Sequence, residues 1–330
     1  MVGLLFVMTM ALLLYGSRLF TDIEEEAHIT QENRIVVGVS QLGSESGWRT
    51  ANTESVQQAF TQKNGYFLIF HNARQKQENQ LKAIRSFISQ RVDYIIFSPV
   101  VETGWETVLQ EAKDAGIPVI IIDRMVDVED DSLYTTWIGT DARSEGQKAG
   151  RWLERYLRTK DRQSDDINII VLQGTIGSTA EIGRTRGFEE IAKNHENWHI
   201  LESATGDFTA IKGKEVMRDM LRRYPDIDVL VSQNDDMTMG AIEAMQEAGV
   251  SFGEHGKVKV ISFDAIHDAL EMVDAGMINV DIECNPVQGA YIDMIIRKLE
   301  KGEPIEKSYV VEENVFTKDN VSEFLDGRTY

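Results

Sequence analysis

The amino-acid sequence predicts an α/β fold made of two doubly wound parallel-sheet domains. Short apolar runs rich in Val and Ile alternate with stretches whose apolar residues recur at helical spacing. This is the pattern of parallel sheets that helices cover on both faces. About ten such runs occur, more than one sheet comfortably holds. The chain has 330 residues, 42% of them hydrophobic, which suffices for two domains with separate cores.

The expected strands follow one another along the chain from Ile35 to Glu283. They cover residues 35–40, 66–71, 94–99, 118–123 and 135–140, then 167–173, 199–203, 229–233, 258–263 and 278–283. Helices are expected between most of them, and residues 77–90 and 213–224 have clear helical spacing. Gly116 and Gly249 mark helix ends.

The N-terminal residues 1–21 predict a membrane-spanning signal-anchor helix. Residues 1–15 are almost wholly apolar, and Gly16 to Phe20 extend the segment to roughly the 20 residues that span a bilayer. The cationic start and the A-x-A-like site of a cleaved secretory signal are missing, which favours an uncleaved anchor. Residues 22–33 are acidic and polar and are expected to form a linker. With either kind of segment, the globular part is expected outside the cytoplasm, tethered or secreted.

Composition excludes several function classes. A net charge of −20 argues against a nucleic-acid partner, because a phosphate backbone would repel the chain. Cys284 is the only cysteine, so neither a disulfide framework nor a cysteine metal cluster is expected. The histidines form no H-E-x-x-H pair, and the turn GTIGS lacks the Lys-Ser/Thr of a P-loop. No metal and no cofactor is expected.

Polar or aromatic residues follow the ends of many expected strands. Ligands of open parallel sheets bind beyond the carboxyl ends of the strands, so these residues predict a binding site. Each also has a structural interpretation: Asp123 and Arg124 as an ion pair, Asp264 as a helix cap, and Phe208 as core. The candidate residues are Trp48, Arg49, Asp123, Arg124, Arg184, Phe208, Asn234, Asp264 and Glu283.

The stretch GSESGWR, residues 43–49, has two interpretations. It can be a helix start, with Ser44 or Ser46 as the cap and Trp48 folded into the core. Alternatively, Trp48 and Arg49 face a ligand. A sugar has apolar C–H faces and a rim of hydroxyls, so it suits an aromatic plate surrounded by carboxylates, arginines and an amide. Trp48 and Phe208 are the candidate plates.

The chain from about Arg34 onward resembles the periplasmic sugar-binding proteins of ABC transporters, of the ribose-binding type. Within that group it is most similar to the galactofuranose-binding members. The resemblance lies in GSESGWR, QKQENQLKAIRSF, SPVVETGWE, IIDR, LQGTIGS with GRTRGF, GDFTAIKGKEVM and QNDDM. It implies the type I periplasmic binding protein fold, with two domains joined by three hinge crossovers near Asp141, Cys284 and Val310. The domains would comprise residues 34–141 plus 284–310, and residues 142–283 plus 311–330.

The resemblance also carries the candidate residues into an interdomain sugar pocket. Ribose binders have two adjacent aromatic residues where this chain has Trp48 and Arg49, which argues against ribose. The function implied is capture of a monosaccharide, galactofuranose or a related sugar, by a monomer that delivers it to an ABC transporter permease. The alternative is a membrane-tethered sugar sensor that signals to a histidine kinase or chemoreceptor.

An enzyme is not expected, so no residue is assigned a catalytic role. Asp123 and Asp264 could serve as the two carboxylates of a glycosidase. The nearby Arg124 and Arg184 would keep them ionised, however, and leave no general acid. A sugar-sensing transcription regulator of this fold would need a basic DNA-binding segment in front, where the sequence has an apolar one. Cys284 is expected to be a buried bystander.

Overall fold

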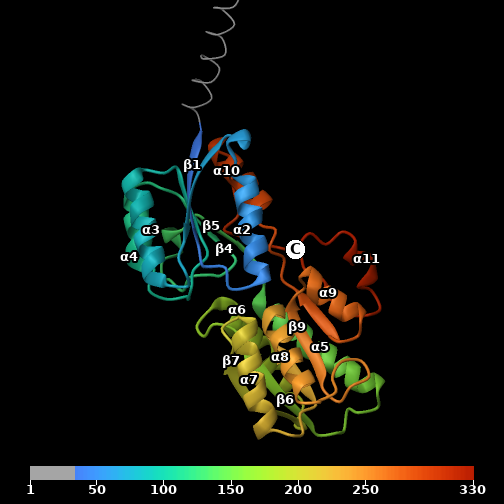
Figure 1. The fold of residues 1–330 in the computed structure, drawn as a ribbon. Helices are drawn as coiled ribbons and strands as arrows, with labels where there is room; N and C mark the ends of the chain where they lie inside the picture. The colour runs from blue at the N-terminus through green and yellow to red at the C-terminus, as the bar shows by residue number, and fades with distance from the viewer. Residues whose placement is uncertain (1–33) are drawn as a thin grey trace, which may run out of the picture.

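Two six-stranded sheets organise residues 34–330, the part of the chain that this computed structural model describes (Figure 1). The first sheet has the order β11-β5-β4-β3-β1-β2, and every neighbouring pair in it is parallel. Its strands are β1 (Ile35–Gln41), β2 (Tyr66–Asn72), β3 (Tyr94–Phe97), β4 (Val119–Ile122), β5 (Thr136–Gly139) and β11 (Ser308–Val310).

The second sheet has the order β12-β10-β9-β8-β6-β7. Its pairs are parallel except that the short β12 runs antiparallel to β10. Its strands are β6 (Ile167–Gln173), β7 (Trp198–Thr205), β8 (Val229–Ser232), β9 (Lys259–Asp264), β10 (Val280–Glu283) and β12 (Val315–Phe316).

Helices cover both faces of each sheet, which explains the continuous apolar runs in the sequence. Every residue of β3, β4 and β8 is buried. On the first sheet, α3 (Gln77–Gln90) and α4 (Glu106–Asp114) pack on one face, and α2 (Gly47–Ala59) and α10 (Gly289–Glu300) on the other. On the second sheet, one face carries α5 (Ala142–Thr159) and α6 (Thr179–Ala192), and the other carries α7 (Ala210–Arg223), α8 (Asp235–Glu247) and α9 (His267–Asp274). Short helices lie at η1 (Gln62–Asn64), η2 (Asp131–Leu133) and α11 (Ser322–Leu325).

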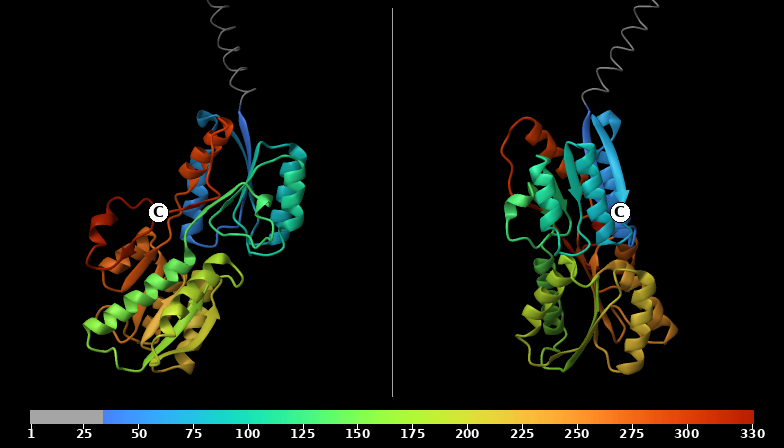
Figure 2. Two further views of the ribbon diagram at one scale, coloured as in Figure 1. Left: turned by 180° about the vertical axis from the view of Figure 1, so that it is seen from behind. Right: turned by 90° about the vertical axis from the view of Figure 1, so that its left-hand side faces the viewer.

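The chain crosses between the two sheets after β5, after β10 and between β11 and β12. The crossings lie side by side between two separate bodies, which all views show one above the other (Figure 2). From this path we propose that residues 34–141 and 284–310 form one lobe, called the first lobe below. Residues 142–283 and 311–330 would then form the second lobe.

The prediction of two α/β parallel-sheet domains is confirmed, and each expected strand is present. The sequence pattern missed β11 and β12, because β11 is largely exposed and β12 has only two residues, so neither forms an apolar run. Among residues 34–330, no helix is long and apolar enough to cross a membrane. The predicted signal-anchor, residues 1–21, and its linker, residues 22–33, lie outside the described residues.

Candidate functional site

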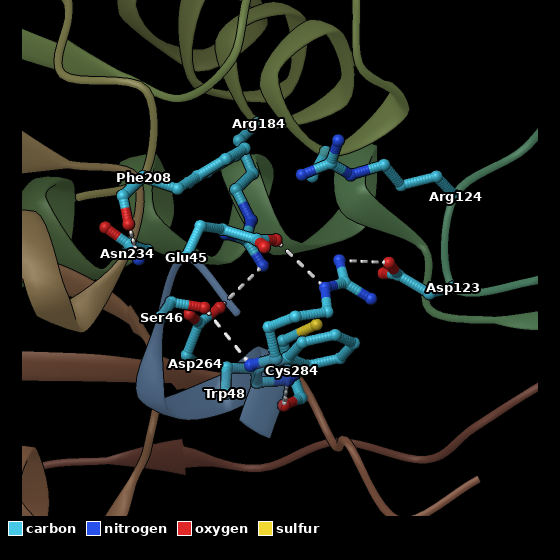
Figure 3. Close-up of a pocket in the computed structure, with 12 residues that line it drawn as sticks. Glu45, Ser46, Trp48, Asp123, Arg124, Arg184, Phe208, Asn234, Asp264 and Cys284 are labelled. Carbon is cyan, nitrogen blue, oxygen red and sulfur yellow. Dashed lines mark hydrogen bonds and ion pairs between the residues drawn. The ribbon is translucent and has the colours of Figure 1, made fainter. Parts of the chain in front are cut away.

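A pocket lies between the two lobes, at the carboxyl ends of strands from both sheets (Figure 3). It contains about 310 Å³ of empty space, part of it open to solvent. Every candidate residue from the sequence except Glu283 lines it. The lining residues are Glu45, Ser46, Trp48, Arg49, Asp123, Arg124, Ala180, Arg184, Phe208, Asn234, Asp264 and Cys284.

Arg49 and Asp123 form the polar wall on the side of the first lobe. Ser46 accepts a hydrogen bond from the Arg49 N–H and caps α2, so the helix-start interpretation of GSESGWR is correct. The buried Arg49 side chain donates from Nη2 to Asp123 Oδ2 at 2.6 Å and from Nε to Glu45 Oε1 at 2.9 Å. Burial would raise the pKa of Asp123, but the charges of Arg49 and Arg124 outweigh burial and hold that pKa below its usual value. Asp123 is therefore an ionised acceptor at neutral pH.

Trp48 belongs both to the core and to the pocket. Its ring is 4% exposed and packs in the apolar cluster of the second lobe, although α2 belongs to the first lobe. The indole Nε1 donates to the main-chain oxygen of Cys284 at 2.5 Å. The Arg49 guanidinium carbon lies over the ring, 4.6 Å from its centre, in cation–π geometry. Both interpretations of Trp48 therefore apply in part, and the residue also joins the lobes.

Arg124 reaches from the first lobe toward Phe208 of the second. Its guanidinium carbon lies 5.4 Å from the centre of the Phe208 ring, and Nη1 donates to Val100 O at 2.9 Å. Within residues 34–330, no other acceptor takes a hydrogen bond from this guanidinium. Burial, together with the positive charge of Arg49, lowers the pKa of Arg124 to about 10. Its remaining N–H groups are suited to donate to the hydroxyls of a ligand.

Arg184 and Asp264 form the corresponding polar wall on the second lobe. Arg184 donates from Nη2 to Asp264 Oδ1 at 3.1 Å, from Nε to Glu145 Oε2 at 2.6 Å, and from Nη1 to the Gln233 carbonyl. Burial would lower the pKa of Arg184, but the negative charges of Glu145 and Asp264 raise it well above its usual value. Burial raises the pKa of Asp264 well above its usual value, and the charge of Arg184 opposes that rise without cancelling it, so the expectation that the arginines keep this carboxyl ionised does not hold for Asp264.

Three pocket residues have a left-handed backbone: Asp123 with φ 60°, Phe208 with φ 61° and Asp264 with φ 111°. Such a conformation is uncommon outside glycine and costs about 1–3 kcal/mol. Asp123 directly follows β4, Asp264 ends β9, and Phe208 lies just beyond β7. The turn at each strand end aims the side chain into the pocket. Strain of this kind gathers at functional sites.

The Phe208 ring depends on two neighbours for its position. A Cβ atom on Gly174 would lie 1.8 Å from Phe208 Cζ, so only glycine leaves room for the ring. Asn234 donates from Nδ2 to the Phe208 carbonyl at 3.2 Å. Its Oδ1 accepts from the Met237 N–H at 3.0 Å and caps α8. Asn234 thus caps a helix, lines the pocket and fixes the main chain at Phe208.

The structure does not bring Glu283 to the pocket lining. Its carboxylate accepts from Arg328 Nη1 at 2.7 Å, from the Tyr330 hydroxyl at 2.8 Å and from Asn314. Successive residues along an extended chain point to opposite sides, so at the end of β10 the pocket position falls on Cys284 instead. Cys284 is buried, as expected, but it also lines the pocket.

Sequence reasoning also missed Glu45, Ser46 and Ala180 as lining residues. Glu45 could have been found, because it lies four residues before Arg49 and pairs with it across the helix start. Ala180 has no polar side-chain atom, so nothing in the sequence marks it as a lining residue.

Basic and acidic side chains are mixed in the lining. Three arginines (Arg49, Arg124 and Arg184) stand beside three acidic residues (Glu45, Asp123 and Asp264). Because hydrogen-bond donors and acceptors alternate around this lining, a ligand with many hydroxyls fits it. Hydroxyls can donate to the carboxylates and accept from the guanidinium groups.

The lobes contact each other directly around the pocket. The Gly47 N–H donates to Asp236 Oδ2 at 3.0 Å, and the Met125 N–H donates to Thr179 Oγ1 at 2.8 Å. The Glu102 N–H donates to the Gly177 carbonyl at 3.1 Å. The pocket is therefore held between lobes that already touch.

Known proteins similar to this chain include one protein family and several sugar-binding relatives. The family model described as "Periplasmic binding protein domain" matches residues 37–304. The galactofuranose-binding protein YtfQ of Escherichia coli (strain K12) is 40% identical over 296 residues, which cover 88% of this chain and 91% of that protein. A Mycobacterium smegmatis crystal structure in complex with β-D-fucofuranose has 43% identity and a TM-score of 0.85, covering 90% of this chain and 95% of that one. The binding protein of the arabinose ABC transporter from Shewanella sp. ANA-3, bound to α- and β-L-arabinofuranose, has 41% identity and a TM-score of 0.83, covering 89% and 95%.

Proposed function

We propose that this chain, which belongs to the family of periplasmic binding proteins, captures a monosaccharide in its furanose form between its two lobes. It would deliver this sugar to the permease of an ABC importer. The family is extracytoplasmic and its members bind solutes, so the sequence-based expectation of a sugar-binding protein rather than an enzyme is confirmed. The observation that carries the proposal is the interlobe pocket, whose arginines and carboxylates come from both lobes.

Each pocket side chain has a role in this proposal. Asp123 and Asp264 accept hydrogen bonds from sugar hydroxyls, one from each lobe, and Arg124 and Arg184 donate to hydroxyl or ring oxygens. Trp48 and Phe208 supply apolar surface for the C–H faces of the ring. Arg49 holds Asp123 ionised and oriented. Asn234 fixes Phe208, and Glu283 has no part in the site.

The furanose ring form is supported by the relatives. The three proteins described above are named for, or hold, galactofuranose, fucofuranose and arabinofuranose, and each is at least 40% identical to this chain. We propose galactofuranose or a closely related furanose as the ligand. None of the three is named as a sensor, so the sensor alternative is not carried forward.

The mode of action we propose is hinge closure. A sugar that contacts both lobes favours the closed state, because only that state makes both sets of contacts. The protein would act as a monomer. Residues 1–21 would direct export and tether it, or be removed, with residues 22–33 as the linker.

The test is titration calorimetry with D-galactose, D-fucose and L-arabinose, with D-ribose for comparison. We expect at least one of the first three to bind at micromolar level or tighter, about −8 kcal/mol or better. The sugar should be recovered unchanged after long incubation.

Two matched variants test whether the sugar binds in this pocket. Arg124→Gln removes a pocket donor and should weaken binding at least about tenfold, because hydrogen bonds to charged groups contribute about 1.5–3 kcal/mol. Arg222→Gln changes an exposed arginine on α7, 73% accessible, and should leave affinity unchanged. Absence of binding to every sugar, or conversion of the sugar, would overturn the proposed function.

A further inference from the structure

A buried cluster of polar side chains lies behind the pocket, where the crossovers between the lobes meet. Glu145 stands in the first turn of α5, Cys284 follows β10, and Glu313 lies between β11 and β12. Their potential ligand atoms lie within 4.8 Å of one another. Glu145 is 0% exposed, and the Glu313 side chain is 3% exposed. Three separate parts of the chain thus meet at one point next to Arg184.

Glu145 is connected to the pocket through Arg184. Its Oε2 accepts from Arg184 Nε at 2.6 Å, and the other two guanidinium nitrogens donate to the Gln233 carbonyl and to Asp264. Glu145 therefore completes a set of three acceptors, one for each nitrogen, that fixes the orientation of the guanidinium in the pocket wall.

Glycines bring Glu145 within reach of Arg184. A Cβ atom on Gly146 would lie 2.3 Å from the main-chain oxygen of Arg184, and one on Gly187 would lie 2.0 Å from that of Arg143. The backbones of α5 and α6 are therefore in direct contact. A larger residue at either position would separate the helices and lengthen the distance between Glu145 and Arg184.

The second carboxylate oxygen of Glu145, Oε1, has no hydrogen-bond donor among the described residues, and a single proton could supply one. Among residues 34–330, neither Glu145 Oε1 nor Glu313 Oε1 has a hydrogen-bond partner. Two buried acceptors without a donor are unfavourable. The two carboxyl groups offer oxygens within 4.8 Å of each other, and a proton on one group turns it into a donor toward the other. Burial and the negative charge of Glu145 raise the pKa of Glu313 to about 10, so Glu313 holds this proton at neutral pH.

The other charged and titratable groups around Glu145 and Glu313 do not remove the proton from Glu313 at neutral pH. Lys148 lies 3.6 Å from Glu313 and, with Arg184, opposes the rise of its pKa without cancelling it. Burial raises the pKa of the Cys284 thiol, which therefore stays neutral. Asp264 is bound to Arg184 by a separate nitrogen.

We propose that Glu145 is a positioning residue for sugar binding, which orients Arg184 and shares one proton with Glu313. Glu313 lies in the third crossover, between β11 and β12, so the shared proton would link that crossover to the pocket wall. This inference rests on the proposed function, because the orientation of Arg184 matters only if a sugar binds there. A divalent metal on Glu145, Cys284 and Glu313 is the competing explanation, and the positive charges of Arg184 and Lys148 disfavour it.

The first test compares two substitutions of Glu145 by calorimetry with the sugar that binds wild type most tightly among D-galactose, D-fucose and L-arabinose. Glu145→Ala removes the acceptor of Arg184 Nε and should weaken binding at least about tenfold. Glu145→Gln keeps an oxygen for Arg184 and gains an N–H that can donate to Glu313, so it should recover most of that loss. Glu190→Gln is the control, because it breaks an exposed ion pair between the same two helices and should not change affinity.

The second test is the pH dependence of affinity in wild type and in Glu313→Gln. Loss of the shared proton near pH 10 places a second negative charge beside Glu145, so wild-type affinity should fall there. In Glu313→Gln an amide N–H replaces the proton, and the fall should be smaller. Arg124 titrates in the same range in both proteins, so the difference between the two curves reports the shared proton.

Coinciding curves, or a Glu145→Gln protein as weak as Glu145→Ala, would overturn this inference while leaving the proposed function intact. A stoichiometric metal in wild type that is lost in Glu313→Gln, detected by elemental mass spectrometry, would also overturn it. Wild-type protein that binds none of the sugars would overturn the proposed function and this inference with it.

Discussion

At the scale of single residues, the pocket is built from side chains that the surrounding chain holds in place. Arg49 and Arg184 each donate to two acidic side chains, and Trp48 is fixed by its bond to Cys284. Asp123 is held in a left-handed turn. Holding the donors and acceptors rigid before the sugar arrives reduces the conformational entropy lost on binding.

Gly174→Ala tests how tightly the pocket is shaped around Phe208. The added Cβ would lie 1.8 Å from the ring, so the ring must move, and sugar affinity should fall about tenfold or more. Overpacking should also lower the free energy of unfolding by about 1–3 kcal/mol. Calorimetry and urea unfolding measure the two effects.

Gly327→Ala is the matched control, since a Cβ there would have no neighbour within 4 Å. It should change neither quantity. If Gly174→Ala bound sugar as wild type does, the Phe208 ring would have no role in shaping the pocket.

At the scale of elements, strand ends made most of the site predictable. Apolar runs located the strands, and the rule that ligands bind beyond their carboxyl ends selected Asp123, Arg124, Asn234 and Asp264. The sequence could not show which way the chain turns at the end of β10. The strand-end rule therefore predicts Glu283 in the pocket, whereas in the structure its carboxylate pairs with Arg328 and Tyr330. Nor could it show the cluster of Glu145 and Glu313, because residues so far apart in sequence meet only through the crossovers.

A second buried carboxyl pair predicts a pH effect. Asp235 begins α8 shortly after β8, and Asp281 lies in β10. Burial raises the pKa of both groups, to about 7 for Asp281, and the charge of Asp281 adds to the rise at Asp235. An unfolded aspartate titrates near 3.9, so the folded state keeps a proton that the unfolded chain loses. The contribution of this pair to stability is therefore complete below about pH 4, and the part due to Asp281 should fall by on the order of 4 kcal/mol as the pH rises through about 7.

Asp281→Asn should flatten this slope, because an amide N–H replaces the proton. Urea unfolding of the sugar-free protein between pH 4 and pH 8 measures it, with the exposed Asp268→Asn as the control. Equal slopes in wild type and Asp281→Asn would show that the pair does not hold the proton.

At the scale of the whole molecule, the pocket lies between the two lobes and belongs to neither alone. Hydrogen bonds such as that from Gly47 to Asp236 connect the lobes directly. Burial raises the pKa of Asp236 to about 6, so near neutral pH it is mostly ionised and accepts this bond well. In the proposed hinge closure, such direct contacts would favour the closed state together with the ligand.

Asp236→Ala should shift the sugar-free protein toward an open state. We expect a larger radius of gyration in solution scattering than for wild type, and compaction when saturating sugar is added. Affinity should fall in proportion to the lost closed population. Asp268→Ala, an exposed change on α9, should scatter as wild type does. Identical scattering of Asp236→Ala and wild type, with and without sugar, would contradict hinge closure.

The most direct test of furanose capture between the lobes is a crystal structure of the protein grown with the sugar that binds most tightly in calorimetry. We expect a five-membered sugar ring within hydrogen-bonding distance of Asp123 and Arg124 from the first lobe and of Arg184 and Asp264 from the second. A six-membered ring, or a sugar that contacts only one lobe, would contradict it.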